Sequence, residues 1–81
     1  MDFKAHIEAA QKEQKRLVSL ADKADDANWV IITVAHDAID EALLRLADRR
    51  HCHVEPFWIE EALKDLDYQV ENARKIHRTR G

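Results

Sequence analysis

The sequence predicts an all-α fold of three antiparallel helices, at about residues 3–24, 27–50 and 56–78. Glycine and proline occur once each, at Gly81 and Pro56, so the turns that β-hairpins need are nearly absent. Most other positions hold residues with a low free-energy cost in a helix, and apolar residues recur at alternating steps of three and four. A chain of 81 residues supports one domain of modest stability, residues 1–81, so dimerisation or another protein could complete the bundle.

The first helix is expected from a stripe of mainly apolar residues that begins just after Asp2, a suitable N-cap. In the middle of this stripe, Ala10 and Gln14 stand where a core favours larger apolar side chains. This helix must therefore approach its neighbours closely or pack loosely. The stripe consists of Phe3, Ile7, Ala10, Gln14, Leu17, Ala21 and Ala24.

The second helix follows a short connection at residues 22–28, in which Asp25, Asp26 and Asn28 are alternative caps. Residues 29–34 are rich in β-branched side chains and by propensity alone resemble a strand. A three-four spacing nevertheless continues for three heptads without glycine or proline, which favours one long helix. The spaced positions are Trp29, Ile32, His36, Ile39, Leu43, Leu46 and Arg50.

The start of this second helix is apolar nearly all round. Val30 and Val34 point in the same direction as Asp37 and Glu41 further along, so they lie outside the arc that the core uses. Such a patch often marks a contact surface. The alternative is that the first helix covers it through Leu17, Val18 and Leu20. The candidate partner-binding residues are Trp29, Val30, Thr33 and Val34.

The third helix should start at Pro56, because proline at the first helical position sacrifices no needed N–H group. Its apolar stripe is Ile59, Leu63, Leu66, Val70, Ala73 and His77. The segment His51-Cys52-His53 falls between the second and third helices and is expected to be a turn. Zinc sites need about four ligands in two spaced pairs, so we expect no metal site here and no cofactor.

Two further groups have a structural and a functional interpretation. His36 and Asp40, one helical turn apart, could form a general base or a pH-responsive contact, or simply a polar edge of the core. Phe3, Phe57 and Trp58 are expected to gather at one end of the bundle near Leu43 and Ala47, as a plug that closes the core or as a ligand pocket.

Charge is distributed unevenly along the chain. The net charge is −3, but residues 74–81 contain only cations, which leaves −7 on the rest. The candidate contacts of this short basic tail to phosphate or an acidic partner are Arg74, Lys75, Arg78 and Arg80; alternatively they complement the helix dipole. The apolar runs are too short to span a membrane, and the lone Cys52 agrees with a reducing compartment, so we expect a cytoplasmic protein.

The first two helices resemble the opening half of HEPN-domain proteins, small helical bundles that include toxin ribonucleases and inactive relatives. The matching pieces are the tryptophan-led apolar run at residues 28–35, the small and apolar residues Ala38 and Ala42-Leu43-Leu44, and the histidine-containing turn; the similarity covers residues 3–53. The resemblance implies a helical dimer. It also implies an alternative function, RNA cleavage by Arg45 and His51, although Leu46 replaces the polar residue that usually follows the arginine.

These patterns together favour a non-catalytic protein–protein interaction module, because no catalytic or phosphate-binding motif is present. A small acidic helical protein with an exposed apolar patch has the character of an inhibitor, adaptor or antitoxin, a class that includes phage-derived proteins. The expected partner is a second copy or a larger protein. The alternatives are the HEPN-like ribonuclease and a weak nucleic-acid binder that uses the basic tail.

Overall fold

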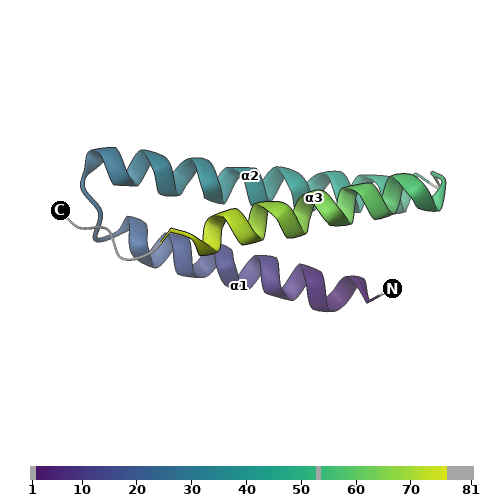
Figure 1. Ribbon diagram of the computed structural model, residues 1–81, viewed down its shortest axis with the longest axis horizontal. Coiled ribbons are helices and arrows are strands. Elements are labelled where there is room, and N and C mark those ends of the chain that lie inside the picture. The colour runs from purple at the N-terminus through teal and green to yellow at the C-terminus, as the bar shows by residue number, and fades with distance from the viewer. Residues whose placement is uncertain (1, 53, 77–81) are drawn as a thin grey trace.

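The computed structural model describes residues 2–52 and 54–76, which form three helices and no strand. The helices are α1 (Phe3–Ala21), α2 (Asp26–His51) and α3 (Pro56–Arg74). Successive helices run antiparallel, side by side, in an elongated bundle of 46 × 18 × 15 Å (Figure 1). The predicted all-α fold of three antiparallel helices is therefore confirmed, and completion of the bundle by a second copy remains a prediction.

Each helix begins where the local sequence predicts. The Asp2 carboxylate accepts a hydrogen bond from the backbone N–H of Ala5 at 3.2 Å. Of the three candidate caps of α2, Asp25 takes the position and accepts from the Asn28 N–H at 2.9 Å. Pro56 opens α3 without a side-chain cap. Proline and carboxylate residues set these starts because the first N–H groups of a helix lack partners within it.

The helix ends differ from the prediction. α1 ends at Ala21 rather than residue 24, and Ala24 lies after the turn. His51, expected in the turn, is the last residue of α2, because the Cys52 N–H still bonds the Asp48 carbonyl at 3.0 Å. α3 ends at Arg74, and the end predicted for it, residue 78, lies outside the described residues.

The core combines large and small side chains from all three helices. The largest fully buried residues are Leu17, Ile32, Ile39, Leu46 and Leu66. Alanines at Ala10, Ala42, Ala62 and Ala73 are also buried, and small residues at these positions let helices approach closely. Ala10 is fully buried, so around this residue α1 approaches its neighbours closely rather than packing loosely.

α2 is longer than both of its neighbours. It has 26 residues, whereas α1 and α3 each have 19. At 1.5 Å per residue this difference is about 10 Å of helix. Near the end of α2, Arg50 lies over the Phe3 ring at 4.3 Å, which places the start of α1 beside this end. The extra length therefore lies at the start of α2, which extends past the end of the α3 ribbon (Figure 1).

Candidate functional site at the apolar start of α2

The first turns of α2 and the facing side of α1 carry an exposed apolar patch. It consists of Val18, Trp29, Val30, Ile31 and Val34, each 50–63% exposed. Typical residue areas convert these fractions to on the order of 500 Å², within the range of the largest patch on a monomer, which is often functional. α1 does not cover Val30 and Val34, so the alternative that it hides them is wrong. Thr33, also predicted in this site, is half-buried.

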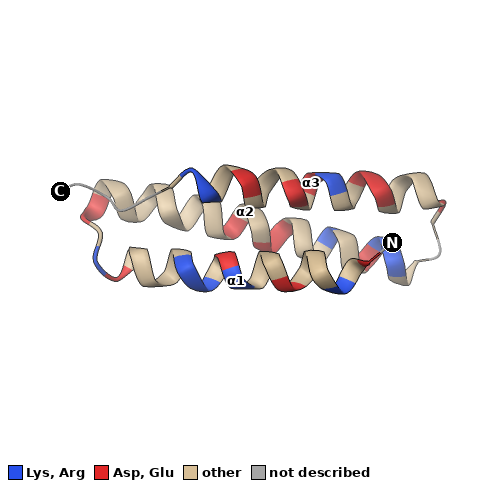
Figure 2. Cartoon of the chain, turned by 60° about the horizontal axis from the view of Figure 1, so that its bottom comes forward, with Lys and Arg blue, Asp and Glu red and all other residues tan. Residues whose placement is uncertain are grey.

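Among residues 2–52 and 54–76, two features leave the apolar patch uncovered. α3 ends at Arg74 and does not reach the first turns of α2. Val30 and Val34 also lie on the outer face of α2, in line with the exposed Asp37 and Glu41, as the helical spacing predicted. Figure 2 shows the start of α2 as a long uncharged stretch after the acidic residues that cap it.

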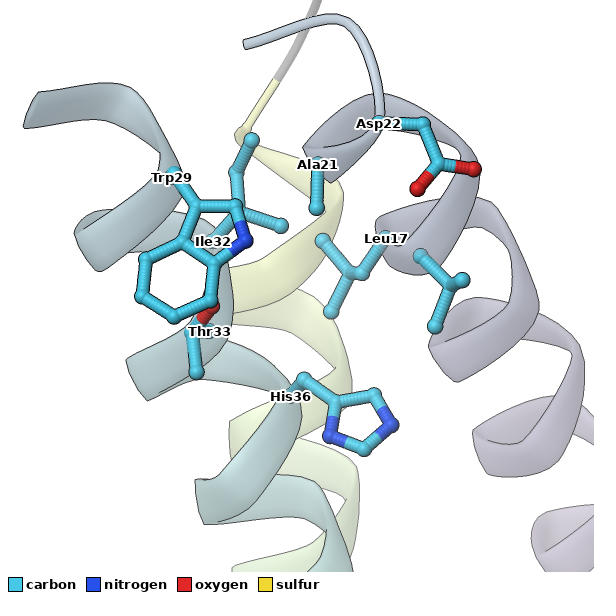
Figure 3. Close-up of a pocket in the computed structure, with 8 residues that line it drawn as sticks. Leu17, Ala21, Asp22, Trp29, Ile32, Thr33 and His36 are labelled. Atoms are coloured by element: carbon cyan, nitrogen blue, oxygen red, sulfur yellow. The ribbon is translucent and has the colours of Figure 1, made fainter. Parts of the chain in front are cut away.

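The inner edge of the patch forms one wall of a groove between α1 and α2. A hollow of about 230 Å³ separates Trp29, Thr33 and His36 on α2 from Leu17, Val18 and Ala21 on α1 (Figure 3). Ile32 and Asp22 complete this lining. A neighbouring hollow shares Val18 and His36 and is also lined by Gln11, Gln14, Lys15 and Ser19. The two hollows together form the α1–α2 groove.

Polar side chains connect the two walls of the α1–α2 groove. Gln14 donates from Nε2 to the His36 carbonyl oxygen at 3.4 Å. The His36 ring extends toward α1 (Figure 3), and its Nδ1 lies 3.3 Å from Oδ1 of Asp37. The predicted pairing of His36 with Asp40 is not observed, because this orientation places Nδ1 beside the adjacent carboxylate. Asp40 is exposed.

The structure does not bring together the two residues of the ribonuclease alternative. Arg45 donates from Nη1 to Oδ2 of Asp65 at 2.8 Å and so connects α2 with α3. His51 is exposed at the end of α2. Six residues on a helix separate Cα positions by about 9 Å along the axis and about 120° around it. These two side chains therefore lie on different faces of α2.

Of the three aromatic residues predicted to gather at the other end of the bundle, Phe3 is half-buried against the core, whereas Phe57 and Trp58 do not plug it. Phe57 and Trp58 form an edge-to-face pair at 5.3 Å, and each is about half exposed. Arg49 lies 5.7 Å from the Trp58 ring and donates to the Trp58 carbonyl oxygen at 2.8 Å. The inward positions of α3 are instead taken by Ala62 and Leu63. These aromatic rings and Arg49 line an open hollow of about 410 Å³.

The described part of the basic tail lies close to basic residues of α1, a proximity that the sequence pattern did not predict. Arg74 bonds Glu71 at 2.6 Å, and Lys75 is exposed. Arg78 and Arg80 lie outside the described residues. Lys12, Lys15 and Arg16 of α1 border the same hollow as Arg74. No spacing in the sequence links these residues, because the association depends on how α1 packs against α3.

The sequence pattern also did not predict that the charged residue Glu13 of α1 is buried. Glu13 is only 8% exposed. Arg16 bonds its carboxylate and also donates to the backbone carbonyl oxygens of Ala73 at 2.7 Å and Ile76 at 2.8 Å. Arg16 therefore bonds a carbonyl group in the last turn of α3, where such groups have no partner within the helix, and another just after the helix ends.

Across residues 2–52 and 54–76, no cluster of three or more histidine, cysteine or acidic side chains is placed to hold a metal ion. Cys52 is a free, exposed thiol at the end of α2. None of the described helices combines the length and apolar character needed to cross a membrane.

Comparisons of this chain with protein families, with characterised proteins and with solved structures gave no significant match.

Proposed function

We propose that this protein is a non-catalytic protein–protein interaction module of the inhibitor, adaptor or antitoxin type, and that it binds through the apolar patch. The exposure of five large apolar residues around one end of the bundle carries this proposal. Single exposed apolar residues are ordinary, whereas a group of this size around the first turns of one helix is characteristic of a binding surface.

The size of the apolar patch is sufficient for a specific interaction. Burying about 500 Å² of apolar surface contributes on the order of 12 kcal/mol at 25 cal/mol per Å². The loss of translational and rotational freedom costs about 4–15 kcal/mol and offsets much of this gain. The patch therefore supports a complex whose affinity is sensitive to single substitutions within it.

Val34→Asp tests the proposal. The side chain is 63% exposed, so we expect the helical content and the thermal midpoint to change little. A charge in the middle of the interface should weaken the complex about tenfold or more, because it removes an apolar contact and adds a carboxylate that must be desolvated. Light scattering measures self-association against the 9.4 kDa monomer mass, and pull-down with quantitative mass spectrometry measures association with other proteins.

Leu44→Asp is the matched control, because Leu44 is 65% exposed on the same helix but lies outside the apolar patch. Like Val34→Asp, it introduces one negative charge on α2 at a side chain that is more than half exposed. If both variants have the same mass and retain the same proteins as the wild type, the apolar patch is not a binding surface and the proposal fails.

A further inference from the structure

We infer that a hollow between α1 and α3 binds a small ligand that carries two or three linked phosphate groups. The hollow has a volume of about 620 Å³, within the usual range of small-molecule sites. It includes none of the five residues of the apolar patch, so the inference goes beyond the proposed function. The charged and polar residues that line this basic hollow are Lys12, Glu13, Lys15, Arg16, Ser19 and Arg74.

The charge of the basic hollow is opposite to that of the whole chain. Four basic residues and one acidic residue line it, which gives a net charge of +3, whereas the chain carries −3. Figure 2 shows basic residues both on α1 and at the end of α3. Because Arg16 bonds the Glu13 carboxylate, this pair is neutral, and the three remaining charges attract anions from both helices.

The two lysines of the basic hollow have unused hydrogen-bonding capacity. Lys4 and Lys64, outside the hollow, lie 4.0 and 3.9 Å from a carboxylate oxygen. Within residues 2–52 and 54–76, neither Lys12 nor Lys15 has a carboxylate oxygen within 4.0 Å. They are three residues apart on α1, so their ammonium groups share a face of the helix and repel each other. A bound anion would offset this repulsion.

Arg74 adds donors from α3. Its Nη1 bonds Oε1 of Glu71 at 2.6 Å, but both side chains are more than half exposed, and such pairs contribute little to stability. A guanidinium has five N–H donors, so a single bonded nitrogen leaves others for a ligand. The helix dipole accounts for a cation at the end of α3. It does not account for Lys12 and Lys15, which lie more than one turn before the end of α1.

Linked phosphates match these donors better than a carboxylate does. A phosphate monoester carries about 1.5–2 negative charges and three acceptor oxygens, whereas a carboxylate carries one charge and two oxygens. Three cations on two helices therefore match about two phosphate groups. Among the described residues, no aromatic side chain lines the basic hollow, so nothing there stacks on a nucleobase. We therefore expect the phosphate groups alone to be recognised.

The surrounding charge favours a small ligand over a nucleic acid strand. The chain before Arg74 carries a net charge of −7. A strand that extended beyond the basic hollow would therefore meet a predominantly acidic chain and be repelled. A ligand confined to the hollow avoids this repulsion.

Isothermal titration calorimetry tests the inference with four probes: inorganic triphosphate, ATP, a glutamate hexapeptide, and an oligothymidylate of about ten nucleotides, comparable to common single-strand site sizes. We expect triphosphate and ATP to bind with equal affinity within about threefold, and the other two probes to bind at least about tenfold more weakly. Added salt should weaken the binding of triphosphate, because the lysines are exposed.

Paired variants test whether the lysines of the basic hollow hold the phosphates. Lys12→Gln with Lys15→Gln should weaken the binding of triphosphate about tenfold or more, because charge-assisted hydrogen bonds from two donors are lost. Lys4→Gln with Lys64→Gln is the matched control, since it removes two exposed lysines on α1 and α3 outside the hollow. We expect it to weaken binding less than about twofold. Circular dichroism verifies that both variants remain helical.

Several results would overturn the inference. They are no binding of triphosphate at about 1 mM, equal losses in the two paired variants, and a glutamate peptide or oligothymidylate that binds as tightly as triphosphate. Tighter binding of ATP than of triphosphate would show that the nucleoside is recognised and would also overturn it. None of these measurements involves the apolar patch, so Val34→Asp decides the proposed function separately.

Discussion

Replacing Arg16 by methionine tests the contact that fixes the end of α3. Arg16 bonds the Glu13 carboxylate through Nε at 2.7 Å and through a second guanidinium nitrogen. It also donates to the carbonyl oxygens of Ala73 and Ile76. Methionine retains most of the apolar stem but has no donor. The substitution therefore removes these hydrogen bonds and leaves the carboxylate of Glu13 without a cation.

The expected loss of stability follows from the burial of the two partners. Removing one member of a buried ion pair costs about 3–5 kcal/mol. The Glu13 side chain is 10% exposed, but that of Arg16 is 37% exposed, so solvent reduces this cost. The loss of hydrogen bonds from a charged donor to the α3 carbonyls adds to it. We expect a decrease of about 3 kcal/mol in the free energy of unfolding, or roughly 15 °C in Tm for a domain of this size.

Urea denaturation followed by circular dichroism measures this decrease, with Lys12→Met as the control. Lys12 is an exposed cation one turn earlier on α1. We expect Lys12→Met to change stability by less than about 0.5 kcal/mol. Adding Glu13→Leu to Arg16→Met should recover part of the loss, because no buried charge then remains unpaired. If Arg16→Met costs no more than Lys12→Met, the proposed role of Arg16 at the end of α3 is wrong.

Two further substitutions test the core and the start of α2. Leu46→Ala should cost about 3–4 kcal/mol in urea denaturation, because Leu46 is 1% exposed, whereas the exposed Leu44→Ala should cost less than about 0.5 kcal/mol; equal costs would contradict the orientation of α2. Asp25→Ala should lower the free energy of unfolding by about 1 kcal/mol, because it removes the acceptor for the Asn28 N–H. An unchanged thermal midpoint would show that this cap does not stabilise α2.

The helix starts were predictable because they depend on local chemistry. Asp2, Asp25 and Pro56 act on backbone groups within one turn, and the sequence shows such neighbours directly. The exposure of Val30 and Val34 was predictable for a similar reason. Once α2 is one continuous helix, the core residues fix which face is inside, and both valines fall outside that arc.

The missed features all depend on contacts between segments far apart in the chain. Glu13 is acidic, and nothing in the spacing of apolar residues around it predicts that it is buried. Its burial depends on Arg16 and on the end of α3. The orientation of His36 toward Asp37 depends on the space left beside α1. The periodicity of apolar residues describes one helix at a time. It therefore predicts which side of the helix faces the core, but not which residues of other helices contact the side chains at the edge of that face.

The fold and the candidate site use different faces of the same stretch of α2, which makes them separable by experiment. Ile32 is 1% exposed and packs in the core, whereas Val30 and Val34 are more than half exposed within two residues of it. A polar substitution at Ile32 would lower stability and binding together, because a buried polar group costs free energy in the folded chain itself. A polar substitution at Val30 or Val34 leaves the core intact. A loss of binding without a loss of helicity at these two positions therefore reports on the apolar patch alone.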